Sequence, residues 1–320
     1  MASPNATFTE LVTTTLREHP TEIADNVSNE NALWRRMNQK KNILKEVDGG
    51  HKIAVPLDYA ENSSFMRYYG AQALNIQESN VLTAAEFDWV QSVVHVTATG
   101  RQLRINSGKN RLINLMKART KNAMRTAANN MSVDLYSSGS LTNQMGGLGH
   151  IIQTAGTGTV GGIDSSTYSF WQNQYKEATG TGPSYTDLKA DMLSLYLSTK
   201  RGNDKTDLIV STYDLYAVYW DQLSDNQRYA SNDTPNTFTA LKFMDADVVP
   251  DLNDNFTSTG EKMYFLNTDF LKVIYHPDAN WTPDPEKTSV NQDAVVVPLY
   301  WMGQMTCSNR ARQGVLIDAS

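Results

Sequence analysis

Residues 107–136 carry an unbroken helical pattern that limits the folds open to this chain. The stretch contains no proline, its only glycine is Gly108 near the start, and Ser107 is a suitable N-cap. At 1.5 Å per residue, we expect a helix of about 45 Å, well above the usual length of about 12 residues. Its apolar stripe consists of Leu112, Met116, Ala123, Ala127, Met131 and Leu135, widened by Ile113, Met124 and Ala128.

The charges on this predicted helix have one sign until Asp134. Lys117, Lys121 and Arg125 are spaced four residues apart, so they share a face and repel one another. Water tolerates such a face, and phosphates or the carboxylates of a partner would stabilise it. The pattern therefore leaves two interpretations open, a solvated basic face or a face toward a polyanion.

Two predicted strands before this helix are separated by an unusually long connection. Residues 53–59 alternate apolar and polar side chains, with Pro56 favouring an edge position, and residues 86–99 form the second strand with a phase slip near Gln91. The connection from residue 60 to residue 85 is far longer than the two to five residues of a normal hairpin. It is rich in apolar side chains that a loop cannot bury by itself: Phe65, Met66, Tyr68, Tyr69, Leu74, Ile76, Val81 and Leu82. We consider a projecting two-stranded arm that packs on a neighbouring subunit, or a third strand in a small local sheet.

The first 45 residues form an arm rather than a domain, because apolar residues are sparse and acidic positions give way to basic ones. A short helix can start near Asn29, and the basic residues follow it. They are Arg35, Arg36, Lys40 and Lys41. Such an arm cannot bury much of its own surface, so we expect it to be disordered or to lie along something else.

Charge is distributed unevenly over the 320 residues. The net charge is −6, which excludes a bulk polycation. Residues 35–136 hold fifteen bases and eight acids, a net of +7, whereas residues 183–295 hold nine bases and eighteen acids, a net of −9. This asymmetry is either local clustering on solvated faces or a protein with one face toward a polyanion and another toward solvent.

The acidic part of the chain mixes the two kinds of secondary structure. We expect helices at 185–202 and 214–223, and strands at 207–211, 247–249, 263–266, 271–275 and 295–302. The strand at 271–275 should end at Pro277. Together with the long helix, these elements predict an α+β protein.

We find no catalytic or cofactor motif. The single cysteine, Cys307, excludes an internal disulfide and is most simply a small buried hydrophobe, and the five histidines have no metal-ligand spacing. Residues 156–161 match G-x-G-x-x-G but lack the surrounding strand–helix–strand pattern, so we interpret them as a flexible crossing. An EF-hand start at Asp251 fails at Phe256 and Lys262. We also expect no membrane span, because no run of about 18 apolar residues exists.

Collinear short stretches along nearly the whole chain resemble the major capsid protein of tailed bacteriophages. They are VPLDYAENS at 55–63, TAAEFDW at 83–89, SGK at 107–109, GGID at 161–164, YFLNTD at 264–269, SVNQDA at 289–294 and TCSNR at 306–310. The order of an arm, a long loop, a long basic helix, a glycine-rich crossing and an α+β body is also similar. The resemblance implies the Hong Kong phage-like coat fold, which bacterial encapsulins share.

The resemblance also assigns regions. Residues 1–45 would be the N-terminal arm and 46–100 the extended loop. Residues 101–182 with 287–320 would form the peripheral domain, with 107–136 as its spine helix, and 183–286 the axial domain. Some relatives crosslink a lysine of the loop, whereas Lys52, the only lysine between 46 and 100, lies at the base of the loop.

The function implied is a structural, non-enzymatic subunit that builds hexamers and pentamers of an icosahedral head around double-stranded DNA. Implied partners are other copies, a portal protein, and separate scaffolding and decoration proteins. The implied location is the virion, after assembly in the host cytoplasm. We expect subunit contacts at Phe65, Arg67, Tyr68 and Tyr69, and DNA-facing bases at Arg35, Arg36, Lys40, Lys41, Lys117, Lys121 and Arg125. The alternatives are an encapsulin-like shell and, from another class, a monomeric α+β hydrolase with a deep pocket.

Overall fold

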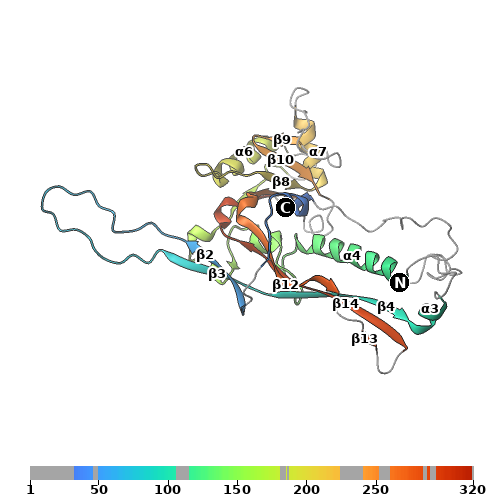
Figure 1. Ribbon diagram of the computed structural model, residues 1–320. Helices are drawn as coiled ribbons and strands as arrows, with labels where there is room; N and C mark the ends of the chain where they lie inside the picture. The colour runs from blue at the N-terminus through green and yellow to red at the C-terminus, as the bar shows by residue number, and fades with distance from the viewer. Residues whose placement is uncertain are drawn as a thin grey trace.

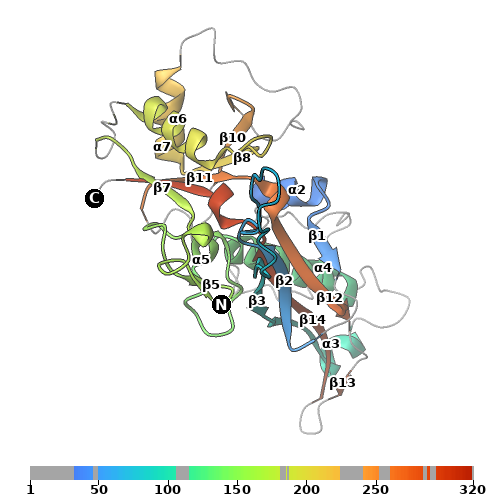
Figure 2. The ribbon, with the colours of Figure 1, turned by 90° about the vertical axis from the view of Figure 1, so that its left-hand side faces the viewer.

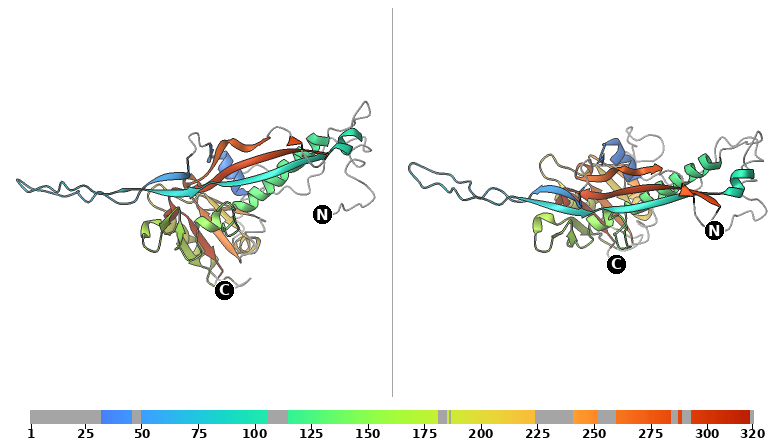
Figure 3. Two further views of the ribbon diagram at one scale, coloured as in Figure 1. Left: turned by 90° about the horizontal axis from the view of Figure 1, so that it is seen from below. Right: turned by 60° about the horizontal axis from the view of Figure 1, so that its bottom comes forward.

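The computed structural model describes residues 32–45, 50–105, 115–180, 185, 187–223, 241–251, 260–283, 287–288 and 293–318. Two sheets, flanking helices and a projecting hairpin make up the molecule, which confirms the α+β class (Figure 1). The hairpin extends from one end of the body, and a long helix runs toward the other end (Figure 3). The molecule is therefore elongated.

A five-stranded sheet forms the lower part of the body in Figure 2. Its strands are β1 (Ile43–Lys45), β4 (Val90–Thr99), β12 (Leu271–Pro283), β13 (Lys287–Thr288) and β14 (Ala294–Cys307). β14 is central, with β12 along one side and β4 along the other, and β4 pairs with it antiparallel from Val90 to Thr99 without a break. β12 continues past Pro277 through a register shift, so the predicted end at this proline is wrong.

The long helix α4 (Leu115–Asp134) packs against β4 of this sheet. Ala123, Ala127 and Met131 are buried, as the predicted stripe requires, and Leu135 is buried just beyond the helix end. Met124 and Ala128 are exposed, so the buried stripe is narrower than predicted. The predicted start at residue 107 lies outside the described residues, and a separate short helix, α3 (Gly100–Ile105), follows β4.

A six-stranded sheet forms the upper part of the body (Figure 2). Its order is β7 (Gln174–Glu177), β15 (Gly314–Ile317), β11 (Lys262–Leu266), β8 (Leu208–Ser211), β10 (Ala246–Pro250) and β9 (Leu241–Phe243). Alternate side chains of β11 point into two different cores. Tyr264 and Leu266 enter the core shared with the five-stranded sheet, whereas Met263 and Phe265 pack with α6 (Leu188–Thr199) and α7 (Tyr213–Gln222).

The division into domains at residues 182 and 286 stays a prediction, and the two sheets are not divided at these positions. β7 and β15, which were assigned to the peripheral domain, lie in the six-stranded sheet, and β12, which was assigned to the axial domain, lies in the five-stranded sheet. The reason is that strand pairing joins segments far apart in sequence, such as β11 with β15. A domain boundary placed at a single residue cannot describe a sheet whose strands come from both sides of that residue.

The strand predicted at 86–99 is interrupted at Trp89, which separates β3 (Leu82–Asp88) from β4. β3 pairs antiparallel with β2 (Lys52–Asp58), and this pair is the base of the projecting hairpin (Figure 1). The remaining short elements are α2 (Ala32–Gln39), α5 (Leu148–Ile151), β5 (Thr159–Val160), β6 (Ile163–Asp164) and the 3-10 turns η1 (Ser169–Trp171), η4 (Thr268–Phe270) and η5 (Arg310–Arg312).

Candidate functional site

The projecting loop between β2 and β3 exposes large aromatic side chains to solvent. Its ladder ends where the Tyr59 amide donates to the Val81 carbonyl at 3.0 Å, and residues 60–81 form no strand. Phe65 is 78% exposed and Tyr69 92% exposed, while the guanidinium carbon of Arg67 lies 5.7 Å from the centre of the Phe65 ring. The third strand considered from the sequence is absent from residues 60–81, all of which are described, and β2 and β3 form a two-stranded sheet. The loop is thus a projecting arm.

The root of this arm is held rigidly by a separate apolar cluster. Ile53, Leu57 and Phe87 of the hairpin pack against Val160 and Trp171. The glycine-rich crossing supplies the close approach, because the Glu86 amide donates to the Gly161 carbonyl at 2.9 Å. Gly161 has a φ of +60°, and a Cβ atom there would lie 2.8 Å from the Cβ of Ala85. Gly161 therefore has a structural use at the root of the projecting hairpin.

A hollow with a volume of about 460 Å³ lies beside this root. Its walls are the β3 edge, the β5–β6 hairpin and the rings of Tyr59, Tyr168 and Phe170. Glu86 is the only ionisable acid in the wall, and neither histidine nor cysteine lines it. No serine lines it either, so this hollow holds no Ser–His or Cys–His pair.

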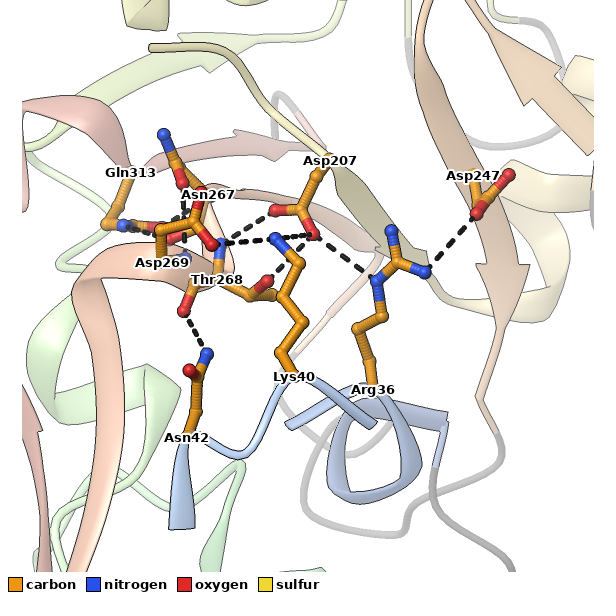
Figure 4. Close-up of polar contacts among 9 residues, drawn as sticks. All are labelled: Arg36, Lys40, Asn42, Asp207, Asp247, Asn267, Thr268, Asp269 and Gln313. Atoms are coloured by element: carbon orange, nitrogen blue, oxygen red, sulfur yellow. Dashed lines mark hydrogen bonds and ion pairs between the residues drawn. The ribbon is translucent and has the colours of Figure 1, made fainter. Parts of the chain in front are cut away.

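The N-terminal segment is clasped to the six-stranded sheet by ion pairs (Figure 4). One carboxylate oxygen of Asp207 lies 3.0 Å from the Lys40 ammonium and 3.3 Å from Nε of Arg36, and it also accepts from the Thr268 hydroxyl at 2.7 Å. Its other oxygen accepts from the Thr268 amide at 2.7 Å. Three further contacts extend the clasp: Arg36 to Asp247 at 3.8 Å, Lys40 to Asp269 at 2.8 Å, and the Asn42 amide to the Thr268 carbonyl.

Apolar contacts complete this attachment. Leu33 and Met37 of α2 are fully buried in the core between the two sheets. β1 then pairs in parallel with β12 at its edge. The described part of the predicted arm therefore lies along the body, which was one of the two expectations for it.

The basic residues expected to face DNA are in different situations. Arg36 and Lys40 are engaged with carboxylates of their own chain. Lys121 is exposed on α4, Arg125 is half-buried there, and the side chain of Lys117 lies outside the described residues. Arg35 is half-buried and Lys41 is exposed beside the clasp. The DNA-facing role stays a prediction for all seven, and the geometry leaves less room for it at Arg36 and Lys40.

Two polar anchors were not found from the sequence. One is Asp207, the centre of the clasp. The other is Arg310, which is fully buried and donates to the Ile151 carbonyl at 2.7 Å and to Asn173 Oδ1 at 3.0 Å. Burial lowers the pKa of the Arg310 guanidinium to about 10. The YFLNTD stretch contains Thr268, which binds Asp207, and the TCSNR stretch ends at Arg310 itself, but neither stretch indicates the distant partner.

Other candidate chemistry is accounted for by packing. Cys307 is fully buried, and burial raises the pKa of its thiol to about 12. The carboxylate of Asp251 accepts from the Tyr136 hydroxyl at 2.6 Å, while residues 252–259 of the calcium-like stretch lie outside the described residues. Over the described ranges, no three His, Cys, Asp or Glu side chains are grouped to hold a metal ion. No helix in this part of the chain is long and apolar enough to cross a membrane.

Sequence comparisons find nothing, whereas structural comparisons are extensive. No protein-family model matches the chain, and no curated protein matches it. A subunit of the cyanophage A-1(L) capsid superposes with a TM-score of 0.69 at 14% identity, covering 95% of this chain and 96% of that one. The capsid of a native GTA particle gives 0.58 at 10% identity, with 93% and 95% covered. The SrpI encapsulin of Synechococcus elongatus gives 0.57 at 8% identity, with 92% and 91% covered.

These matches define a fold shared by shell-building proteins. Each covers more than nine tenths of both chains, so the likeness extends over most of the fold. This chain therefore has the Hong Kong phage-like capsid fold, and the fold predicted from the resemblance is confirmed.

Proposed function

We propose that this chain is the major capsid protein of a tailed bacteriophage. It would self-assemble into hexamers and pentamers of an icosahedral head that encloses double-stranded DNA. The observation that carries the proposal is the match over 95% of the chain to a subunit of a cyanophage capsid. A structural role of this kind needs neither a catalytic residue nor a cofactor, and it places the protein in the virion after assembly in the bacterial cytoplasm.

Size is the decisive measurement for this proposal. Purified protein should sediment as closed shells in the megadalton range, and negative-stain images should show them. A monomer of 35.7 kDa under all assembly conditions would contradict the proposal and favour the monomeric hydrolase.

The exposed loop supplies the subunit contacts in this proposal. Phe65, Arg67, Tyr68 and Tyr69 would lie against a neighbouring subunit, where each large apolar side chain buried contributes about 1.5–3 kcal/mol. Changing Phe65, Tyr68 and Tyr69 together to Ser should leave soluble, folded subunits that fail to close shells. Normal shells from this variant would show that the loop is not an assembly contact.

Packaged DNA would meet basic side chains without sequence preference, so salt should weaken the contact. The exposed Lys121 and Lys41 are the best placed of the predicted residues with described side chains, followed by the half-buried Arg125 and Arg35. A portal protein and separate scaffolding or decoration proteins would be further partners. Assembled shells with and without Lys121→Gln can be compared for retained DNA as salt is raised.

An encapsulin-like shell is the second candidate, and the similarity to the Synechococcus elongatus encapsulin supports it. Both candidates predict closed shells, so the contents distinguish them. Nuclease-protected double-stranded DNA inside shells from infected cells supports the phage head. A stoichiometric protein cargo without DNA supports the encapsulin.

A further inference from the structure

The outer edge of β4 is an open ladder. Main-chain groups alternate sides along a strand, and three contacts fix which side is which. The Gly100 amide donates to the Asp293 carbonyl on the β14 side at 2.8 Å. The Thr97 carbonyl accepts instead from Arg119, and the Thr99 amide donates to Gln102 Oε1, both on the outer side. The amides and carbonyls of the odd-numbered residues therefore point away from β14.

Three of these residues, Gln91, Val93 and His95, have outward groups without a ladder partner. β4 pairs with β14 alone among the described strands. The next outward carbonyl and amide, at Thr97 and Thr99, are capped by side chains that follow in the chain. The open part of the edge therefore covers residues 91–95 and the amide of Thr97.

Other edges in this molecule are protected, whereas this one is not. β1 and β9 are three residues long, β7 carries Lys176 and Glu177, and β2 contains Pro56. By contrast, residues 91–97 contain no charged side chain other than the titratable His95, no proline and no register shift. Long, flat, uncharged edges are templates for pairing with another chain.

One face of the sheet beside this edge is also free. Val96 and Leu299 face α4, where they pack with Ala123. On the opposite face, Val93 lies beside its register partner Tyr300, and both side chains are exposed. An added strand would thus find both hydrogen-bonding groups and an apolar surface.

The projecting loop contains a matching segment. Residues 72–77 are uncharged, apolar and polar side chains alternate from Leu74 to Gln77, and Leu74 and Ile76 are exposed, the latter at 91%. Six residues in extended form span about 20 Å, close to the open stretch of β4. Within one chain, the loop and β4 extend in opposite directions from the base of the hairpin (Figure 3). Only a second copy can therefore supply the segment.

We propose that residues 72–77 of one copy add as a strand to residues 91–97 of the next copy. The contact is head-to-tail, because the two surfaces are different parts of the chain, and such contacts close into rings when the rotation permits. This inference rests on the proposed shell-forming function, and it identifies the surface of the next copy that binds the projecting loop. Main-chain pairing provides affinity here, and the side chains of Leu74 and Ile76 provide the fit.

Proline scanning along β4 tests the acceptor. Val93→Pro removes an outward amide, which an edge strand tolerates, so the subunit should fold with unchanged circular dichroism. Its yield of shells should fall by about tenfold or more, the effect of losing about 1.4 kcal/mol per contact. The matched control Val93→Ala keeps the amide and should assemble. Ser92→Pro removes an inward amide and should fail to fold, which verifies the assignment of sides.

Hydrogen exchange tests both partners without relying on a variant that may misfold. In wild-type shells, the amides of residues 91, 93 and 95 should exchange about tenfold more slowly than in unassembled subunits. Leu74→Asp with Ile76→Asp should abolish this protection, whereas the control Asn75→Asp should retain it. Wild-type shells without such protection overturn the proposal and leave the shell function intact. Protection that survives the double Asp variant also overturns it, because another segment then occupies the edge. Absence of wild-type shells refutes the proposed function itself.

Discussion

Asp207 should be the most sensitive polar residue of the subunit, because one carboxylate serves two cations and two Thr268 donors. Thr268 is fully buried, so each of its hydrogen bonds to the charged carboxylate is worth about 1.5–3 kcal/mol. The Arg36 and Lys40 side chains are 30% and 27% exposed, so screening reduces each ion pair to about 0.5 kcal/mol. Asp207→Ala should therefore lower the free energy of unfolding by about 4 kcal/mol. Asp207→Asn, which keeps one acceptor oxygen, should cost about half of that.

The assay is urea unfolding of unassembled subunits, followed by tryptophan fluorescence. Asp245 offers a matched control, since its carboxylate pairs with Lys205 at 2.9 Å on the same sheet but both side chains are largely exposed. Asp245→Ala should leave the unfolding midpoint almost unchanged. If Asp207→Ala is no more destabilising than Asp245→Ala, the clasp does not hold the N-terminal segment and the reasoning is refuted.

Three further predictions concern the arm root, the long helix and acid stability. Gly161→Ala should destabilise the hairpin root more than Gly162→Ala, because both residues have positive φ but only the first would place a Cβ against Ala85; differential scanning calorimetry gives the comparison. Ala123→Pro should cost about 3 kcal/mol or more and yield insoluble protein, whereas normal solubility would show that residue 123 is outside a helix. Burial and the nearby Arg310 lower the pKa of His150 below its ordinary value of 6.5, so the unfolded chain binds the proton first. Stability should therefore decrease as the pH falls through 6.5, and urea unfolding of His150→Gln should show a smaller decrease.

Local periodicity was sufficient for the elements whose burial is one-sided. β2 was predicted to within one residue because its side chains alternate. The described part of α4 was predicted as helix because its buried alanines and methionine recur at helical spacing. β14 was predicted too short. Its last residues include Gln304 and Thr306, whose polar side chains predict exposure to solvent, but both are buried. Gln304 is tolerated there because its side-chain oxygen accepts from the Gly146 amide, 158 residues away in sequence.

The N-terminal segment, residues 32–45, was harder to predict because its partners are distant in sequence. Arg36 and Asp207 are 171 residues apart, and nothing near either residue indicates the other. A run with few apolar residues therefore left two expectations open, disorder or packing along something else, and the sequence did not show that Leu33 and Met37 of α2 would be buried in the body. Only the resemblance to capsid proteins supplied the long-range order, and it did so without assigning residue contacts.

The uneven charge distribution has a different physical meaning from the one that the sequence suggests. Ion pairs join the basic and acidic stretches within one chain: Arg36 with Asp207 and Asp247, Lys40 with Asp207 and Asp269, and Arg104 with Asp293 at 2.9 Å. Part of the +7 and part of the −9 therefore neutralise each other across the junction of the sheets. The DNA-facing surface that we propose would therefore depend on bases outside these pairs, such as Lys121, which is exposed on α4. A basic stretch in a sequence becomes a basic surface only where folding does not place it against acids of the same chain.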